Sequence, residues 1–164
     1  MRRRGQIHLS FSMLVSIIVI ISVVAVGFYT ITYFLNYWNC TQIGLFYEDL
    51  RTMTKDARDS QAGYSDIFVG KLPSKVEEVC MGNLSARARD VRKEFDLLKN
   101  EAKLANVFMY PPKSGCDLKL SYSKIEYIEN KNFFCAENVD GKVKLRVEKN
   151  NFGPVLLSPV LEPQ

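Results

Sequence analysis

Cysteine is the residue type whose number and placement in this chain indicate chemistry. The four cysteines follow one another at spacings of 40, 36 and 19 residues, so none forms the close pairs typical of zinc sites. The only histidine, His8, lies near the start of the chain, before all four. An even number of widely spaced cysteines predicts two disulfides formed in an oxidising compartment. The four residues are Cys40, Cys80, Cys116 and Cys135.

Three pairings of these cysteines are possible. The pair Cys80–Cys135 is favoured because both residues lie in strand-like stretches, VEEVCMGN and KNFFCAEN. That choice leaves Cys40–Cys116, which would tie the domain down near its start. Each bond would stabilise the fold by about 2–4 kcal/mol. The alternative is four buried thiols in a reducing compartment, which requires the opposite membrane topology to the one deduced below.

No other set of side chains in the sequence resembles a catalytic or ligand-binding constellation. Because no histidine follows His8, a Ser–His or Cys–His pair cannot be built beyond it. There is no Gly-rich phosphate loop and no cluster with metal-ligand spacing. The acidic pairs Glu48-Asp49 and Glu77-Glu78 are adjacent in sequence, which is typical of solvated surface. We therefore predict no catalysis, no cofactor, no metal and no small-molecule substrate.

The charges are unevenly distributed along the 164 residues. Lys and Arg number 22 and Asp and Glu 18, which gives a net charge of +4. Arg2, Arg3 and Arg4 supply three of these charges, and no acid precedes Glu48. A nucleic-acid binder would carry its basic residues on the folded part, so the nearly neutral remainder predicts no nucleic-acid partner. The long uncharged stretch before Glu48 excludes an ordinary cytosolic globule.

The segment Phe11–Leu35 contains neither a charge nor a proline. As a helix rising about 1.5 Å per residue it is long enough to cross a bilayer core of about 30 Å, and too long for a secretory signal peptide. Aromatic residues collect at its far end, and the arginines at its near end favour a cytoplasmic N-terminus. We therefore predict a protein of the cell membrane, with a basic cytoplasmic segment at 1–10, a transmembrane helix at 11–38 and an extracytoplasmic remainder.

One face of this helix collects small and hydroxyl-bearing residues. Ser12 and Ser16 form a small-xxx-small pair, which lets helix backbones approach closely in lipid. This pattern predicts self-association or contact with another membrane protein. The alternative is that the hydroxyls bond back to their own helix. We call this set the small-residue stripe, and it consists of Ser12, Ser16, Gly27 and Thr30.

The residues before the apolar run, Arg3-Arg4-Gly5-Gln6, resemble the class III signal peptide of archaeal type IV pilin-like proteins. The resemblance is confined to the N-terminal region. In that family a prepilin peptidase cuts between a glycine and a glutamine, which implies processing between Gly5 and Gln6 here. The family usually carries a glutamate at the fifth mature position, where this chain has Ser10. That departure bears on filament assembly more than on cleavage.

The remainder is predicted to be an α+β domain at 39–150, followed by an irregular Pro-containing tail at 151–164. Apolar residues spaced by three and four predict two amphipathic helices, at 42–60 and 85–106. The first could continue directly from the membrane helix, with Asn39 or Gly44 as break points, and Gly63 would end it. Asp140-Gly141 predicts a tight hairpin. Strand-like stretches predict a mainly antiparallel sheet from 66–72, 75–81, 107–110, 121–129, 132–138 and 142–148.

These patterns together predict a single-pass, membrane-anchored extracytoplasmic protein with a structural or interaction role. Its partners would be the lipid bilayer and, through the helix, further copies of itself or another membrane protein. Two alternatives stay open: a pilin-like subunit cut after Gly5 and assembled through its apolar helix, and an accessory subunit of an envelope enzyme or secretion complex. Asn83 and Asn39 also match the acceptor pattern for N-glycosylation.

Overall fold

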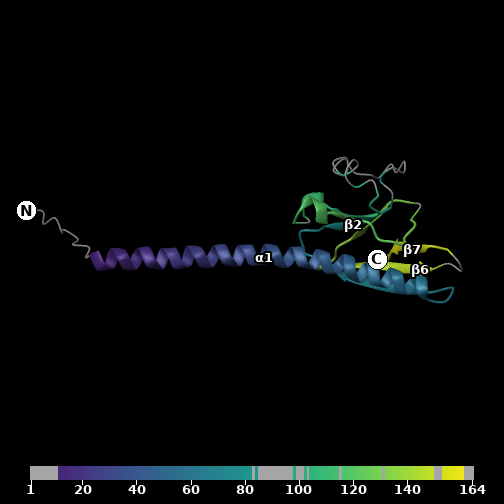
Figure 1. Cartoon of the computed structure of the whole chain (residues 1–164), viewed down its shortest axis with the longest axis horizontal. Coiled ribbons are helices and arrows are strands. Elements are labelled where there is room, and N and C mark those ends of the chain that lie inside the picture. Colours follow the sequence, from purple (N-terminus) through teal and green to yellow (C-terminus); the bar gives the residue numbers. More distant parts are fainter. Residues whose placement is uncertain are drawn as a thin grey trace, which may run out of the picture. The chain divides into compact units, whose positions relative to one another are not determined.

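The chain divides into two compact units, Met1–Asn36 and Tyr37–Gln164. The boundary between them lies close to residue 38, the predicted end of the membrane helix. Figure 1 labels the main elements of the computed structural model. The structure describes residues 11–82, 84, 98, 102, 104–114, 116–130, 132–149 and 153–160.

The helix α1 spans Phe11–Asp59 and therefore continues through both helical segments predicted at 11–38 and 42–60. The backbone stays helical across Asn39 and Gly44, so neither acts as a break point. The helix ends before Gly63. There the Lys149 side chain donates from Nζ to the carbonyl of Ser60 at 2.6 Å and to that of Arg58. A cation that binds the last carbonyls stabilises a helix C-terminus, so a residue far along the chain helps to end α1.

The part of α1 in the second unit is amphipathic, as its spacing predicts. It buries one row of side chains, while the intervening charged residues stay exposed. Thr54 is the one hydroxyl in the buried row, and its Oγ1 donates to the carbonyl of Arg51 at 3.0 Å. A helix with this pattern packs on a core along a single face. The buried residues are Ile43, Phe46, Tyr47, Leu50, Thr54 and Ala57.

Sheet A is antiparallel and has the strand order β1-β6-β7, with β1 at Ser65–Lys71, β6 at Lys142–Lys149 and β7 at Val155–Pro159. The helix packs closely on it, since the rings of Phe46 and Phe68 lie 5.5 Å apart, edge to face. Gly70 makes room for this contact. A Cβ at that position would stand 2.4 Å from the Phe46 ring, which is too close for any larger residue without a shift.

Sheet B is also antiparallel, with strand order β4-β3-β2-β5. Alternate residues of β2 and β3 face opposite sides, as the period of a strand requires. One side joins the main core that lies between α1 and the two sheets, and the other belongs to a second cluster built around Cys80 and Phe108. The strands are β2 (Glu78–Met81), β3 (Val107–Tyr110), β4 (Tyr122–Ser123) and β5 (Phe134–Glu137).

The tight turn predicted at Asp140-Gly141 is confirmed, but the strand pairing expected of a hairpin is not, because β5 and β6 on its two sides belong to different sheets and only the isolated bridge Val139–Lys142 spans the turn. Val139 and Lys142 exchange backbone hydrogen bonds of 3.0 Å, and both turn residues have positive φ, 53° and 74°. A turn with positive φ at both central residues is the type whose twist matches that of the strands it joins. It leads directly into β6, whose strict apolar–polar alternation is reproduced by its burial.

Two of the predicted strands are much shorter than expected. The stretch 75–81 contributes only β2, because the amide of Asn138 donates to the carbonyls of Pro73 and Val76 and holds that segment in a turn. The stretch 121–129 contributes only β4. Tyr127 has φ 72°, in the left-handed region that extended strands do not use, and Ile125 instead pairs its backbone with the side chain of Asn106.

The tail at 151–164 was predicted to be irregular, and this is wrong for its central part. Residues 155–159 form β7, because Val155 and Leu157 alternate into the main core while Leu156 points outward. The predicted helix at 85–106 lies almost wholly outside the described residues. Of it, Leu98 and Ala102 are buried against the second cluster, and the Ala102 N–H donates to the Leu98 carbonyl at 2.7 Å.

Candidate functional site

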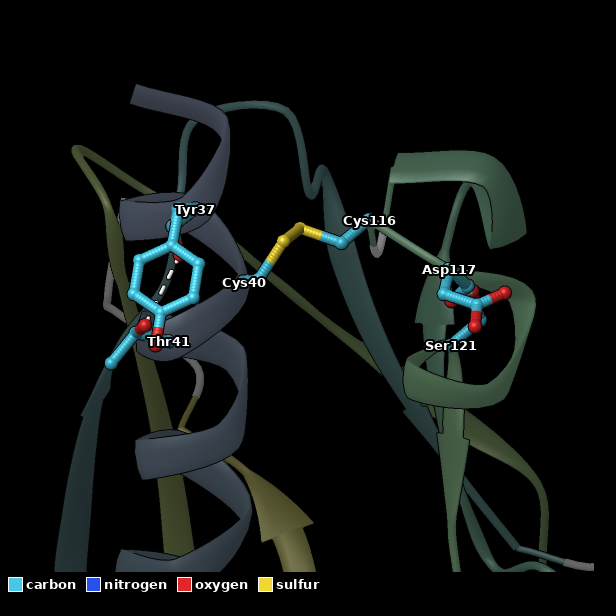
Figure 2. The surroundings of a disulfide bond; sticks show 6 residues. All are labelled: Tyr37, Cys40, Thr41, Cys116, Asp117 and Ser121. Atoms are coloured by element: carbon cyan, nitrogen blue, oxygen red, sulfur yellow. Dashed lines mark hydrogen bonds between the residues drawn. A yellow bond between two sulfur atoms is a disulfide. The ribbon is translucent and has the colours of Figure 1, made fainter. Parts of the chain in front are cut away.

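The disulfide Cys40–Cys116 joins α1 to the loop between the short helices η2 (Pro112–Ser114) and η3 (Leu118–Leu120). Figure 2 shows it with its neighbours on both sides. The Cα atoms of the two cysteines lie 5.5 Å apart. The buried hydroxyl of Ser121 donates to the carbonyl of Pro112 and holds the loop end in place. The bond therefore ties the start of the second unit's helix to a loop that has its own internal support.

A hydrogen bond reinforces the same connection about two turns further along α1. The Tyr47 hydroxyl of α1 donates to the carbonyl of Leu120 in η3 at 3.0 Å. Tyr47 is almost fully buried, and this burial raises the pKa of its hydroxyl far above the ordinary value. The side chain therefore stays neutral and acts as a donor throughout the physiological range.

The disulfide Cys80–Cys135 joins β2 and β5 at positions that oppose each other directly in the sheet. It lies in the second cluster together with Phe108 and the partly buried Phe133, whose ring centroids are 6.2 Å apart. The prediction that Cys80 pairs with Cys135, which leaves Cys40 to pair with Cys116, is therefore confirmed for both disulfides. With all four sulfur atoms in disulfides, the chain has no free thiol.

Two groups of acidic residues lie near this sheet. The carboxylate of Glu78 comes within 4.8 Å of the sulfur atoms of Cys80 and Cys135. Because those sulfurs are bonded to each other, they are not thiolate ligands for a metal. A neighbouring open pocket of about 460 Å³ is also acidic, but its lining includes no histidine, cysteine or basic residue that could complete a catalytic set. It is lined by Ser74, Val76, Glu77, Glu78, Glu137, Asn138, Asp140 and Gly141.

The apolar half of α1 is the largest unpartnered feature of the described residues. From Phe11 to Tyr37 every residue is exposed, and the helix is long and apolar enough to cross a membrane. The aromatic residues near its end, among them Tyr33 and Trp38, are more than half exposed. An exposed apolar surface of this size is typical of a region that contacts lipid or another protein.

The small-residue stripe lies on this half of α1, and its hydroxyls at Ser16 and Thr30 bond to their own helix. The Ser16 Oγ donates to the carbonyl of Ser12 at 3.0 Å, and the Thr30 Oγ1 to that of Val26 at 2.8 Å. A Cβ added at Gly27 would meet no atom within 4 Å. The stripe therefore offers space for a neighbouring helix, while the Ser16 and Thr30 hydroxyls already donate within their own helix.

The other candidate sites are modification sites. Gly5 and Gln6, which the signal-like segment marks for cleavage, lie outside the described residues, as does Asn83. Asn39 lies inside α1, next to the disulfide-bonded Cys40. A helical, half-buried position differs from the surface loop in which glycosylated asparagines are usually found.

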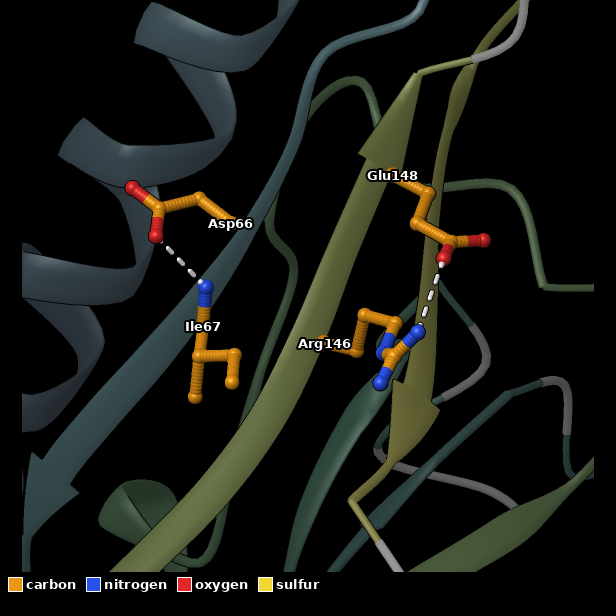
Figure 3. Close-up of polar contacts among 4 residues, drawn as sticks. All are labelled: Asp66, Ile67, Arg146 and Glu148. Atoms are coloured by element: carbon orange, nitrogen blue, oxygen red, sulfur yellow. Dashed lines mark hydrogen bonds and ion pairs between the residues drawn. The ribbon is translucent and has the colours of Figure 1, made fainter.

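The outer face of sheet A, turned away from the main core, is a surface that the sequence did not reveal. It presents Ile67 and Val69 of β1 and Leu156 of β7 beside the basic side chains of β6. The alternation of β6 predicts one solvent-exposed face. Only the register between β1 and β6 shows that Ile67 lies opposite Arg146 and Val69 opposite Lys144. Glu148 supplies the one acidic side chain of β6 and lies 3.8 Å from Arg146, as Figure 3 shows.

Comparison of the chain with protein-family models, with curated proteins and with solved structures finds no match.

Proposed function

We propose that this protein is a single-pass membrane protein whose second unit works outside the cytoplasm as a structural or interaction domain. The observation that carries the proposal is the fully exposed apolar half of α1. Apolar surface transferred out of water gains about 25 cal/mol per Å², so a helix of this size has a large drive to enter lipid. The arginines before it favour a cytoplasmic N-terminus.

The two disulfides support the extracytoplasmic side for the domain. Disulfides persist in oxidising compartments and are rare in the cytosol. Both bonds lie within the second unit, and together they use all four cysteines. The described residues of that unit include no histidine, which supports a role in contact rather than in catalysis.

The test is membrane extraction and surface proteolysis of the full-length chain. We expect the parent protein to stay in the membrane after alkaline washing, and protease added to intact cells to remove the residues beyond about Asn39. Arginine substitutions at Ile20 and Val23 should release it, since each costs about 2.5–3.5 kcal/mol at the helix centre. The matched control places arginines at Glu48 and Thr52, exposed positions of the other half of α1, and should leave anchoring unchanged.

The outcomes separate the parts of the proposal. Release of the parent protein by alkaline washing contradicts the anchor. Protection of the domain in intact cells, with digestion only after lysis, contradicts the topology. Four cysteines alkylated without reductant in freshly isolated protein would contradict the oxidising compartment.

A second candidate function is that of a pilin-like subunit. One observation favours it: the apolar segment and the helix that packs in the domain core are a single helical element. A subunit that assembles through an N-terminal helix needs such a continuous element. N-terminal sequencing of the purified protein distinguishes the candidates, since a chain that begins at Gln6 supports the pilin-like subunit and one that begins at Met1 argues against it.

A further inference from the structure

The two edges of sheet A differ in how the described residues cover them. At β7 the segment 127–130 lies along the edge: the Val155 N–H donates to the Tyr127 carbonyl at 2.9 Å, and the Asn130 side chain accepts from the Leu157 N–H at 3.1 Å. At β1 no described strand pairs on the side away from β6. Among the described strands, β1 is therefore the place in this sheet where a further strand can add.

The hydrogen bonds at the two ends of β1 show which of its backbone groups point away from β6. The Lys149 N–H donates to the Tyr64 carbonyl and the Leu72 N–H to the Gly141 carbonyl, so the even-numbered residues of β1 bond to β6. The odd-numbered residues, at positions 65, 67, 69 and 71, therefore direct their N–H and C=O groups to the other side. An antiparallel strand bonds to such alternate residues, two hydrogen bonds to each.

One of these outward groups is held by a neighbouring side chain. The Ile67 N–H donates to the Asp66 carboxylate at 2.7 Å, on the side away from β6 in Figure 3. The same carboxylate accepts from the Tyr64 hydroxyl at 3.3 Å, so it keeps a partner when another strand takes over the Ile67 N–H. β1 contains neither a proline nor a bulge, two devices that prevent an edge strand from pairing.

The exposed side chains in the middle of β1 are apolar. Ile67 and Val69 are 49% and 51% exposed on the outer face of sheet A. In a further antiparallel strand the residues directly opposite them would lie on the same face, so apolar residues there would cover both. The even-numbered positions face α1, and the Phe46 ring fills the space beside Gly70. The intervening residues of the added strand therefore have to be short.

The end of β1 at Lys71 is basic. Lys71 lies directly opposite Lys142 of β6, and both side chains are exposed. Like charges in directly opposed positions destabilise the pairing of their strands. A glutamate of the added strand opposite Lys71 would relieve this repulsion. It would also lie within reach of the long Lys142 side chain, since strands two apart are separated by about 10 Å.

The other end of β1 is acidic. Ser65 lies opposite Glu148, whose carboxylate is 3.8 Å from Arg146, and the exposed Asp66 follows Ser65 in β1. A cation of the added strand opposite Ser65 would contact the Asp66 carboxylate, which no longer binds the Ile67 N–H. The short serine would also let a long basic side chain reach Glu148. The two ends of β1 thus favour opposite charges in a partner.

We propose that β1 binds an extended segment of another protein as an additional antiparallel strand, with an acid opposite Lys71, apolar residues opposite Val69 and Ile67, and a cation opposite Ser65. Along the partner chain the order is acid, apolar, apolar and cation at alternate positions, with short residues between them. The antiparallel direction is favoured because directly opposed residues then exchange both backbone hydrogen bonds. The inference rests on the proposed function, since it names the kind of partner that the interaction domain binds.

The test is binding of synthetic peptides to the full-length protein in detergent micelles, measured by fluorescence anisotropy. The matched peptide is Glu-Thr-Val-Thr-Val-Thr-Lys with capped ends. A charge-reversed peptide exchanges its glutamate and lysine, and an acidic peptide has glutamate in place of both valines. We expect the matched peptide to bind about tenfold more tightly than either, because each opposed charge pair or apolar pair contributes a few-fold.

Substitution of Lys71 tests the charge order. Lys71→Glu should reduce the tenfold ratio between the matched and the charge-reversed peptide to about one, because the acid of the matched peptide then meets a like charge. The matched control is Lys55→Glu, at an exposed position of α1 outside sheet A, and it should leave the ratio unchanged.

Substitution of Val69 tests the backbone pairing. Val69→Pro removes an N–H that points away from β6, so sheet A keeps its own hydrogen bonds while binding of the matched peptide should weaken more than tenfold. Val69→Thr keeps the N–H and should weaken binding only a few-fold. Unchanged binding by Val69→Pro would overturn the proposal. If Val69→Pro does not fold, the comparison of Lys71→Glu with Lys55→Glu decides.

Hydrogen exchange tests whether the edge is accessible in the protein alone. The amides of Val69 and Lys71 should exchange rapidly without peptide and several times more slowly with the matched peptide. Protection of both amides without peptide would mean that another part of the chain or a second copy covers β1, and would overturn the proposal. Equal binding of the matched and the acidic peptide would show only a general attraction of anions to the basic face, and would overturn it as well.

The anchor and the strand addition can fail independently. A protein that stays in the membrane after alkaline washing but does not distinguish the peptides contradicts the strand addition and leaves the anchor intact. A protein that alkaline washing releases contradicts the anchor, whereas the peptide measurement in detergent still decides whether β1 accepts a strand.

Discussion

The two halves of α1 share one helical backbone but differ in what surrounds their side chains. Between Phe11 and Tyr37 all sides of the helix are apolar or weakly polar, and every residue is exposed. Between Ile43 and Ala57 one row is buried against two sheets, and the other faces carry charges. Both halves keep the same helical backbone, whereas the arrangement of apolar residues decides whether a half can be covered by the protein's own domain.

The largest contrast should come from truncating one apolar side chain in each half. Leu50 is fully buried, and Leu50→Ala should lower the free energy of unfolding of the domain by about 2–5 kcal/mol, because it removes apolar contact and leaves a cavity. Ile20→Ala, on the exposed half, should leave it unchanged within about 0.5 kcal/mol. Chemical denaturation of the full-length protein in detergent measures both. Equal losses would mean that the exposed half also packs on the domain.

Removal of the disulfide that secures the buried half should have the next largest effect. The double substitution Cys40→Ala with Cys116→Ala opens a link between residues 76 positions apart, and should cost about 2–4 kcal/mol of domain stability. The control is Thr41→Ala, because that exposed hydroxyl bonds only to the carbonyl of Tyr37 in its own helix. Hydrogen exchange should then show faster opening of the loop at residue 116. An unchanged unfolding midpoint would mean that packing alone holds α1 in the domain.

The hydrogen bond from Tyr47 should contribute less. Tyr47→Phe should cost about 0.5–1.5 kcal/mol near neutral pH, since the partly buried carbonyl of Leu120 loses its donor. Burial raises the pKa of this hydroxyl in the folded state, so the parent protein should lose stability as pH rises past about 10, where the unfolded chain releases the proton.

Tyr47→Phe lacks that proton, so its disadvantage should shrink above pH 10. Denaturation of parent and variant at a series of pH values checks this, with the exposed Tyr37→Phe as the control. A constant difference between parent and Tyr47→Phe across the series would show that burial does not perturb this hydroxyl.

The smallest effect on the stability of the domain should come from the exposed half itself, where the change is expected in association between helices instead. Replacing Ser12 and Ser16 together by leucine fills the space through which a neighbouring helix would approach, at a cost of about 1–2 kcal/mol of association or less. The domain should stay folded, because both residues lie in the other unit. Ser22→Leu is the control, since Ser22 also bonds to its own helix but lies off the small-residue stripe. Cross-linking between cysteines at the cytoplasmic end, compared in one lipid, measures the change. Equal cross-linking in all variants would mean that the small-residue stripe does not pack against a neighbouring helix.

Sequence reasoning was accurate where a pattern is local. The spacing of Ile43, Phe46 and Leu50 predicts the buried row of α1, and the alternation from Lys142 to Glu148 predicts β6. It was inaccurate where contacts between residues far apart in the chain decide the local structure. The shortening of the strand before Glu78 depends on the amide of Asn138, and the order in the tail depends on pairing between β7 and β6.

The amino-acid sequence by itself determined a long apolar helix, an even set of cysteines suited to disulfides, and a tight turn at Asp140-Gly141, because each follows from composition or from contacts between near neighbours. The tertiary structure alone decided that β1 lies at an edge of sheet A among the described strands, and that Ile67 and Val69 lie on it beside the basic residues of β6. The physical reason is that strand order and register are set by pairing between residues far apart in the chain, and a one-residue change in register moves every side chain to the opposite face.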